Sequence, residues 1–153
     1  MKIDTELGRM VWHLIEDCRT GLLTTADKSG WPHATWMNFQ IKGYLDEIFT
    51  VTAPTTQKVA NLRENPRAEW MFSNPPLESI ATVSGETRII EGDAVQSYWD
   101  AIPGKSRAYY QRYNDTDDFR KFVVLSTTVA KVFFCRPMAY RKFQILDAEK
   151  AAH

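Results

Sequence analysis

The spacing of apolar residues changes several times along the chain, and each change predicts a different kind of element. Near the N-terminus, Val11, Leu14, Ile15 and Cys18 recur at intervals of three and four residues, which is typical of an amphipathic helix within residues 1–20. Further along, apolar and polar residues alternate or form short apolar runs, which is the pattern of strands. Strands are expected at residues 21–26, 32–41, 48–53, 67–72, 80–91, 122–126, 128–135 and 139–145.

Residues that begin and end helices punctuate this pattern. Thr56 precedes a run of helix-forming residues at 57–64, and Pro66 ends that run because the residue before a proline avoids helical backbone. Helical spacing returns at residues 93–102 and 106–113. So many short strands with so few helices predict an antiparallel barrel of α+β type, whose first three strands form a meander. Gly85 is expected to kink one long strand.

The composition is that of an ordinary globular protein. The 153 residues suit one domain, 1–153, and 44% of them are hydrophobic, so a core can form without disulfides or metals to hold it. Nineteen basic residues balance nineteen acidic ones, which argues against a nucleic-acid binder that depends on neutralising bulk phosphate. The tail at residues 147–153 is polar and is expected to fray.

The same sequence bears on the compartment. No apolar run approaches the roughly 20 residues of a membrane span, and residues 1–6 lack the apolar region of a secretory signal, so no membrane association is expected. The two cysteines, Cys18 and Cys135, lie far apart and do not make a disulfide framework. Their number and placement indicate a reducing, cytoplasmic environment.

Motifs of common catalytic and metal sites find no support. Gly104-Lys105-Ser106 resembles the end of a phosphate-binding P-loop, but Trp99 stands where that motif needs a glycine. His13, His33 and His153 have no ligand spacing with cysteines or carboxylates, so no metal site is predicted. No residue is identified as a general acid or base.

One short segment does suggest a ligand. A strand is expected to end at Ala53 and a helix to begin after Thr56, so the unpaired N–H groups of a helix N-terminus follow a strand closely. Lys58 falls in the first helical turn, where the helix dipole disfavours a cation unless an anion lies beside it. A phosphate group would suit this arrangement. The alternative is that Thr55 and Thr56 only cap the helix and that Lys58 is only solvated.

The order of several segments resembles a known family. The segments are Gly30–Ala34, which opens the second strand, the strand at 46–52, Thr56–Lys58, and Asn61–Arg67 with its sequence NLRENPR. In this order they resemble the pyridoxamine 5′-phosphate oxidase-like FMN-binding proteins, and most closely the general stress protein branch. The resemblance runs from about residue 11 to residue 144. It implies a six-stranded antiparallel split β-barrel, mainly β within the α+β class, with a few flanking helices.

The resemblance also implies a homodimer that binds two FMN molecules at the subunit interface. The residues that it assigns to FMN are Thr35, Trp36, Met37 and Asn38 on the second strand, Val51 and Thr52 on the third, and Thr56, Gln57 and Lys58 at the phosphate. The larger oxidases of the family have arginine at the positions of Thr35 and Gln57. This chain therefore offers fewer cations to the phosphate, and the C-terminal substrate-binding segment of those oxidases has no clear counterpart here.

Three functions are consistent with these observations. The first is a small FMN-dependent oxidoreductase with a small-molecule redox substrate. The second is a non-enzymatic flavin-binding or stress protein. The third is a split barrel that binds haem or a deazaflavin, for which His33 would be the axial candidate in the haem case. The absorbance spectrum separates flavin from haem, and turnover with a nicotinamide donor separates the first two functions.

Overall fold

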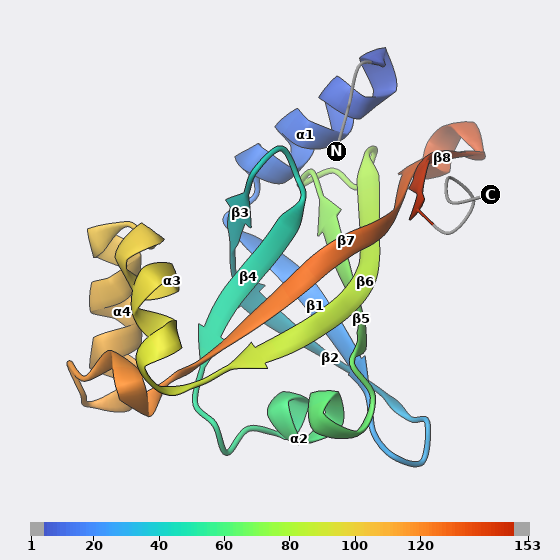
Figure 1. Ribbon diagram of the computed structural model, residues 1–153. Coiled ribbons are helices and arrows are strands. Elements are labelled where there is room, and N and C mark those ends of the chain that lie inside the picture. The colour runs from blue at the N-terminus through green and yellow to red at the C-terminus, as the bar shows by residue number, and fades with distance from the viewer. Residues whose placement is uncertain (1–4, 149–153) are drawn as a thin grey trace.

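The structure is a computed structural model that describes residues 5–148, and it consists of one antiparallel sheet rolled into a barrel with helices around it (Figure 1). The strands are β1 Thr20–Ala26, β2 Pro32–Asn38, β3 Gln40–Lys42, β4 Glu47–Thr52, β5 Arg67–Ser73, β6 Ile80–Ile90, β7 Val123–Arg136 and β8 Arg141–Asp147. The helices are α1 Glu6–Asp17, α2 Gln57–Glu64, α3 Val95–Ala101 and α4 Gly104–Asn114, with the 3-10 turns η1 Gly92–Ala94, η2 Phe119–Lys121 and η3 Pro137–Ala139.

The strand order confirms the predicted fold class and corrects several details. Neighbouring strands follow the order β2-β1-β5-β6-β7-β4-β3, and β8 pairs with β7. The described sheet therefore has eight strands rather than six. The predicted meander is confirmed in part: β1 pairs with β2, and β4 pairs with β3, which lies at the end of the predicted second strand, but β2 itself does not pair with β4. The tail that is expected to fray lies beyond the described residues except for its start, and Asp147 still belongs to β8.

Two predicted strand boundaries are wrong for a shared reason, which is contact with distant residues. The expected strand at 32–41 is divided at Phe39, whose ring leaves the strand to pack on Phe72 with centroids 4.8 Å apart. The two strands expected at 122–126 and 128–135 are the single strand β7. Its polar centre stays in the strand because the hydroxyl of Thr127 accepts a hydrogen bond from the indole of Trp70 at 3.0 Å inside the barrel.

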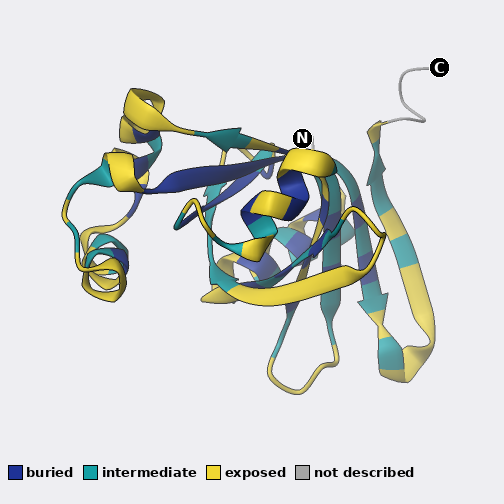
Figure 2. Cartoon of the chain, turned by 90° about the horizontal axis from the view of Figure 1, so that it is seen from below, coloured by how far each residue is buried: buried dark blue, intermediate teal, exposed yellow. Residues whose placement is uncertain are grey.

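The barrel is incomplete between β2 and β4. The hydroxyl of Thr50 on β4 donates to the carbonyl oxygen of Asn38 at 2.6 Å, which joins the two strands at one point. Away from that point β2 pairs with β1, and residues 50–52 of β4 pair with β7. The wall of the barrel is thus split between β2 and the last residues of β4. Helix α2 lies across the lower end of the barrel, where it contacts β1 and β6 (Figure 2).

Two apolar cores hold these elements. The barrel interior contains Leu23, Trp70, Phe72 and Phe134, and α1 adds to it through its buried face. A second cluster lies outside the barrel wall, between β4, β7 and the helices α3 and α4, and contains Phe49, Val51, Val95, Trp99, Tyr110 and Phe122. Because β4 contributes to both cores, its position is determined from both faces. Within residues 5–148, no helix combines the length and apolar character that crossing a bilayer requires.

The predicted kink at Gly85 is confirmed. The pairing of β6 with β7 shifts register between Ser84 and Gly85, so that Ser84 lies opposite Lys131 and Gly85 opposite Val129. A Cβ atom at Gly85 would overlap the carbonyl oxygen of Thr128. Only glycine lets the two backbones approach this closely, and the irregularity lets both long strands bend around the barrel.

Candidate functional site

The N-terminus of α2 emerges almost directly from the end of β4. Thr56 is the N-cap residue, with extended backbone, and its carbonyl oxygen accepts hydrogen bonds from the amides of Val59 and Ala60 at 3.1 and 3.2 Å. Its hydroxyl donates backwards to the carbonyl oxygen of Ala53 at 3.2 Å, so no side chain caps this helix. The amide of Thr56 donates to the carbonyl oxygen of Ala53, so of the first N–H groups only those of Gln57 and Lys58 have no hydrogen-bond acceptor among the described residues.

Lys58 adds a positive charge to this uncapped end. Its side chain is half-buried, and burial lowers the pKa of its ammonium group. Among the ion pairs of the described residues, none joins Lys58 to a carboxylate. Arg63, on the same helix, is different because its guanidinium contacts Glu91 at 2.6 Å. The helix dipole and an unneutralised lysine therefore act together at one place, which is the electrostatic requirement of an anion site.

Gln57 and Asn61 extend this site toward the barrel. The Gln57 amide nitrogen donates to Oδ1 of Asn61 at 2.7 Å, and Nδ2 of Asn61 donates to Oγ1 of Thr25 on β1 at 3.0 Å. In the sequence, Asn61 is a landmark of the family resemblance, and Thr25 is not among the predicted site residues. The spacing of Gln57 and Asn61, four residues apart on a predicted helix, was the available signal. No sequence signal indicated the contact of Asn61 with Thr25 on β1, because the two residues are 36 positions apart.

The predicted residues of β2 do not all face the same way. Thr35 lies opposite Leu23, which is buried in the barrel core, so Thr35 and Met37 share the inner face of the sheet. Trp36 lies opposite Leu22 and shares the outer face. Thr35 and Met37 therefore lie on the barrel side of β2, the strand that borders the split, and Met37 packs against the barrel core. The indole of Trp36 lies on the opposite face and is 64% exposed.

The two predicted residues of β4 are separated in the same manner. The side chain of Val51 is buried in the outer cluster beside Phe49 and Val95, so only its backbone remains for a ligand. Thr52 is almost as buried but comes directly before the turn into α2. Asn38 is held through its carbonyl oxygen by Thr50.

His33, the candidate axial ligand for haem, lies on β2 two residues before Thr35. Its Nε2 atom is 3.0 Å from the carboxylate of Asp27, which also accepts the amides of Ser29 and Trp31. These hydrogen bonds, led by that of His33, lower the pKa of Asp27. The arrangement stabilises the β1–β2 turn and leaves one ring nitrogen of His33 outside it.

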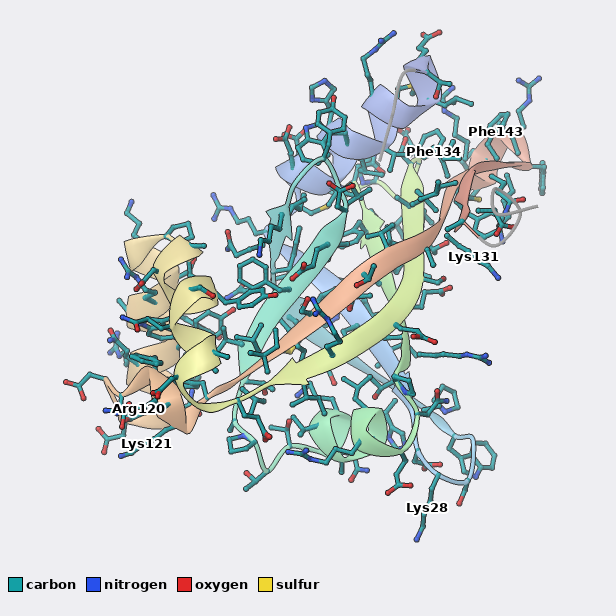
Figure 3. The ribbon with its side chains drawn as sticks, in the orientation of Figure 1. Lys28, Arg120, Lys121, Lys131, Phe134 and Phe143 are labelled. Atoms are coloured by element: carbon teal, nitrogen blue, oxygen red, sulfur yellow. The ribbon has the colours of Figure 1, made fainter. Side chains whose placement is uncertain are left out.

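Elsewhere the basic side chains are dispersed. Lys28 lies on the β1–β2 loop, Arg120 and Lys121 on η2, and Lys131 on β7 (Figure 3). They belong to separate edges of the molecule and form no continuous basic face. Lys105, from the segment that resembles a P-loop, lies at the start of α4. There it lines a groove of about 740 Å³ between α1, the β2–β3 junction and α4. Asn38 lines the same groove.

Comparisons with known proteins agree with this architecture. A crystal structure of general stress protein 26 from Bacillus anthracis str. Sterne has a TM-score of 0.71 at 15% identity, covering 92% of this chain and 99% of that one. A related protein from Clostridium acetobutylicum has a TM-score of 0.74 at 16% identity, with 95% and 97% covered. A pyridoxamine 5′-phosphate oxidase-related, FMN-binding protein from Nostoc punctiforme PCC 73102 has a TM-score of 0.67 at 14% identity, with 90% and 82% covered.

These structural similarities show a common fold and, at such low identity, nothing more. No curated protein matches the sequence significantly. The sequence itself matches the family model described as pyridoxamine 5′-phosphate oxidase over residues 11–136, which span β1 to β7 and therefore the split, α2 and both cores. The chain belongs to the pyridoxamine 5′-phosphate oxidase family.

Proposed function

We propose that this protein binds FMN and acts as a small oxidoreductase, with the FMN phosphate at the N-terminus of α2. The observation that carries the proposal is the half-buried ammonium of Lys58, which has no carboxylate partner among the described residues and lies beside an uncapped helix end. A phosphate would accept hydrogen bonds from the backbone amides of Gln57 and Lys58 and from the Lys58 ammonium. Gln57 would contribute a neutral donor beside them.

The flavin ring and ribityl chain would lie along the split. Thr35 and Met37 lie on the barrel side of β2 and Thr52 at the end of β4, so two hydroxyl groups and a thioether border the split. When bound, FMN supplies the electron-transfer chemistry, and the protein holds and orients it. Cys18 and Cys135 are free thiols, which fits a protein of the reducing cytoplasm.

A second copy of the chain would dock on the outer face of the sheet, beside the split. On the outer face of the sheet, Trp36, Leu22 and Met71 lie in one row across β2, β1 and β5, and Trp36 and Met71 are 64% and 38% exposed. Exposed apolar rows of this kind are typical of protein interfaces. The row lies on the strand that carries Thr35 but on its other face, so a partner docked there would approach the edge of the split from outside the barrel.

Light scattering is expected to give a particle of about twice the 17.6 kDa chain mass. A stable interface of this type buries more than about 2,000 Å² in total, and loss of a large central aromatic weakens such an interface strongly. Trp36→Ser should therefore shift the protein toward monomer at micromolar concentration. Trp31→Ser is the matched control, because Trp31 is also exposed (72%) but lies in the β1–β2 loop. A wild-type monomer with cofactor bound would contradict the proposed dimer.

Affinity for FMN compared with riboflavin tests the phosphate site directly. The two ligands differ only in the phosphate, and a hydrogen bond to a charged group contributes about 1.5–3 kcal/mol. The apoprotein is therefore expected to bind FMN at least about tenfold more tightly than riboflavin in a fluorescence titration. Equal affinities would remove the basis for placing a phosphate at α2.

Two alternative cofactors have relatives of the same fold. An F420 reductase has a TM-score of 0.58 at 20% identity, and a haem-binding protein from Mycobacterium smegmatis has a TM-score of 0.70 at 20% identity. The uncapped α2 end with Lys58 favours a phosphorylated ligand over haem. The absorbance spectrum of the purified protein distinguishes them, because a Soret band would indicate haem. Turnover with a nicotinamide donor then separates an oxidoreductase from a protein that only stores or senses flavin.

A further inference from the structure

A chain of hydrogen bonds links the N-terminus of α2 to the barrel wall. It runs from the side-chain amide of Gln57 through Asn61 to the hydroxyl of Thr25, with distances of 2.7 and 3.0 Å. Asn61 and Thr25 are each only 2% exposed. The other buried positions of α2 are the apolar Val59 and Leu62, so Asn61 is the one buried polar residue of this helix.

We propose that Asn61 is a positioning residue of the phosphate site, which holds the Gln57 amide ready at the start of α2. The proposal rests on the function proposed above. It assigns to Asn61 the orientation of the Gln57 side-chain amide toward the phosphate. Asn61 is fixed on both sides, because Oδ1 accepts from Gln57 and Nδ2 donates to Thr25. A buried amide is stable only with its hydrogen bonds made, so this orientation is maintained.

The chemistry of the Gln57 amide explains what the contact achieves. A primary amide carries two N–H donors, of which Asn61 uses one and leaves the other for a ligand. A free glutamine side chain loses rotational freedom when it binds, and that loss lowers affinity. Asn61 removes this loss in advance because it holds Gln57 before the ligand arrives. Gln57 then contributes a directed neutral donor beside the charge of Lys58.

The test compares FMN with riboflavin in a set of variants. Gln57→Ala is expected to reduce the preference for FMN over riboflavin by about tenfold, and Asn61→Ala by about fivefold, with riboflavin affinity nearly unchanged in both. The double variant is expected to match Gln57→Ala alone, because Asn61 acts through Gln57. Asn61→Leu, which keeps a similar volume, is expected to give the same loss of preference if Asn61→Ala does not fold.

Val59→Ala is the control for helix packing. Val59 is 1% exposed on the same helix and makes no contact with the hydrogen-bond chain, so this variant should lower the free energy of unfolding and keep the FMN preference. If the wild type has no preference for FMN, the proposed phosphate site fails. If the wild type has the preference and the Asn61 variants keep it, the positioning role alone is overturned. Multiplicative losses in the double variant, or an equal loss in Val59→Ala, would also overturn it.

Discussion

Replacing Lys58 by alanine is expected to weaken FMN binding by roughly 10- to 150-fold. A charge-assisted contact with a phosphate contributes about 1.5–3 kcal/mol, and each 1.4 kcal/mol is tenfold in affinity. The free protein is expected to lose no stability, because the half-buried ammonium has no carboxylate partner within residues 5–148 and lies at the positive end of the helix dipole. Titration of the apoprotein with FMN and a parallel urea denaturation measure the two effects separately.

Arg63→Ala is the charge-matched control for Lys58→Ala. It removes a cation from the same helix, but Arg63 lies in the last turn of that helix and is paired with Glu91. FMN affinity should change little, because the influence of the helix end and the reach of a phosphate both decline within one turn. If Arg63→Ala harms FMN binding more than Lys58→Ala does, the phosphate does not bind at this end of α2.

Gly85→Ala is expected to lower the free energy of unfolding by about 3 kcal/mol or more. The added methyl group would overlap the backbone oxygen of Thr128, and backbone within a paired sheet cannot move aside as a flexible side chain can. The register shift that bends β6 and β7 would have to change, although the buried residues Val83 and Thr87 of β6 lie on either side of it. Chemical denaturation of the two proteins measures the loss.

Gly104→Ala is the control for the loss of a glycine as such. Gly104 is the first residue of α4, and a Cβ atom there would meet no atom within 4 Å. Alanine is also the better helix former, so this variant should be as stable as the wild type or slightly more stable. Equal stabilities for Gly85→Ala and Gly104→Ala would show that the close approach of β6 to Thr128 carries no constraint.

Features that depend on neighbours in sequence were predictable. Helix α2 was expected at residues 57–64 and is observed at Gln57–Glu64, because Thr56 and Pro66 act locally on its two ends. The conflict between Lys58 and the helix dipole is equally local, so the candidate phosphate site could be located without coordinates. The bend at Gly85 was also predictable from the sequence nearby, because a glycine stands within an otherwise regular strand pattern.

Features that depend on distant partners were not predictable. Phe39 interrupts a regular alternation because Phe72 and Trp70 provide a place for its ring, and nothing near residue 39 signals them. Thr127 continues a strand through a polar stretch because Trp70 and Thr87 satisfy its hydroxyl. The alternation that separates Trp36 from Thr35 is visible in the sequence. Which of the two faces is the barrel interior follows only from the pairing with Leu22 and Leu23.

The position of β7 in the sheet bears on how the protein is made. β7 pairs with β4 and β6, yet it follows both in the chain, and 32 residues of helix and turn separate it from the end of β6. On the ribosome, the open edges of β4 and β6 must therefore wait until about residue 136 has left the exit tunnel. Unpaired strand edges attract other chains during such a wait. A polypeptide that ends before β7 is expected to aggregate rather than to persist as a partly folded monomer.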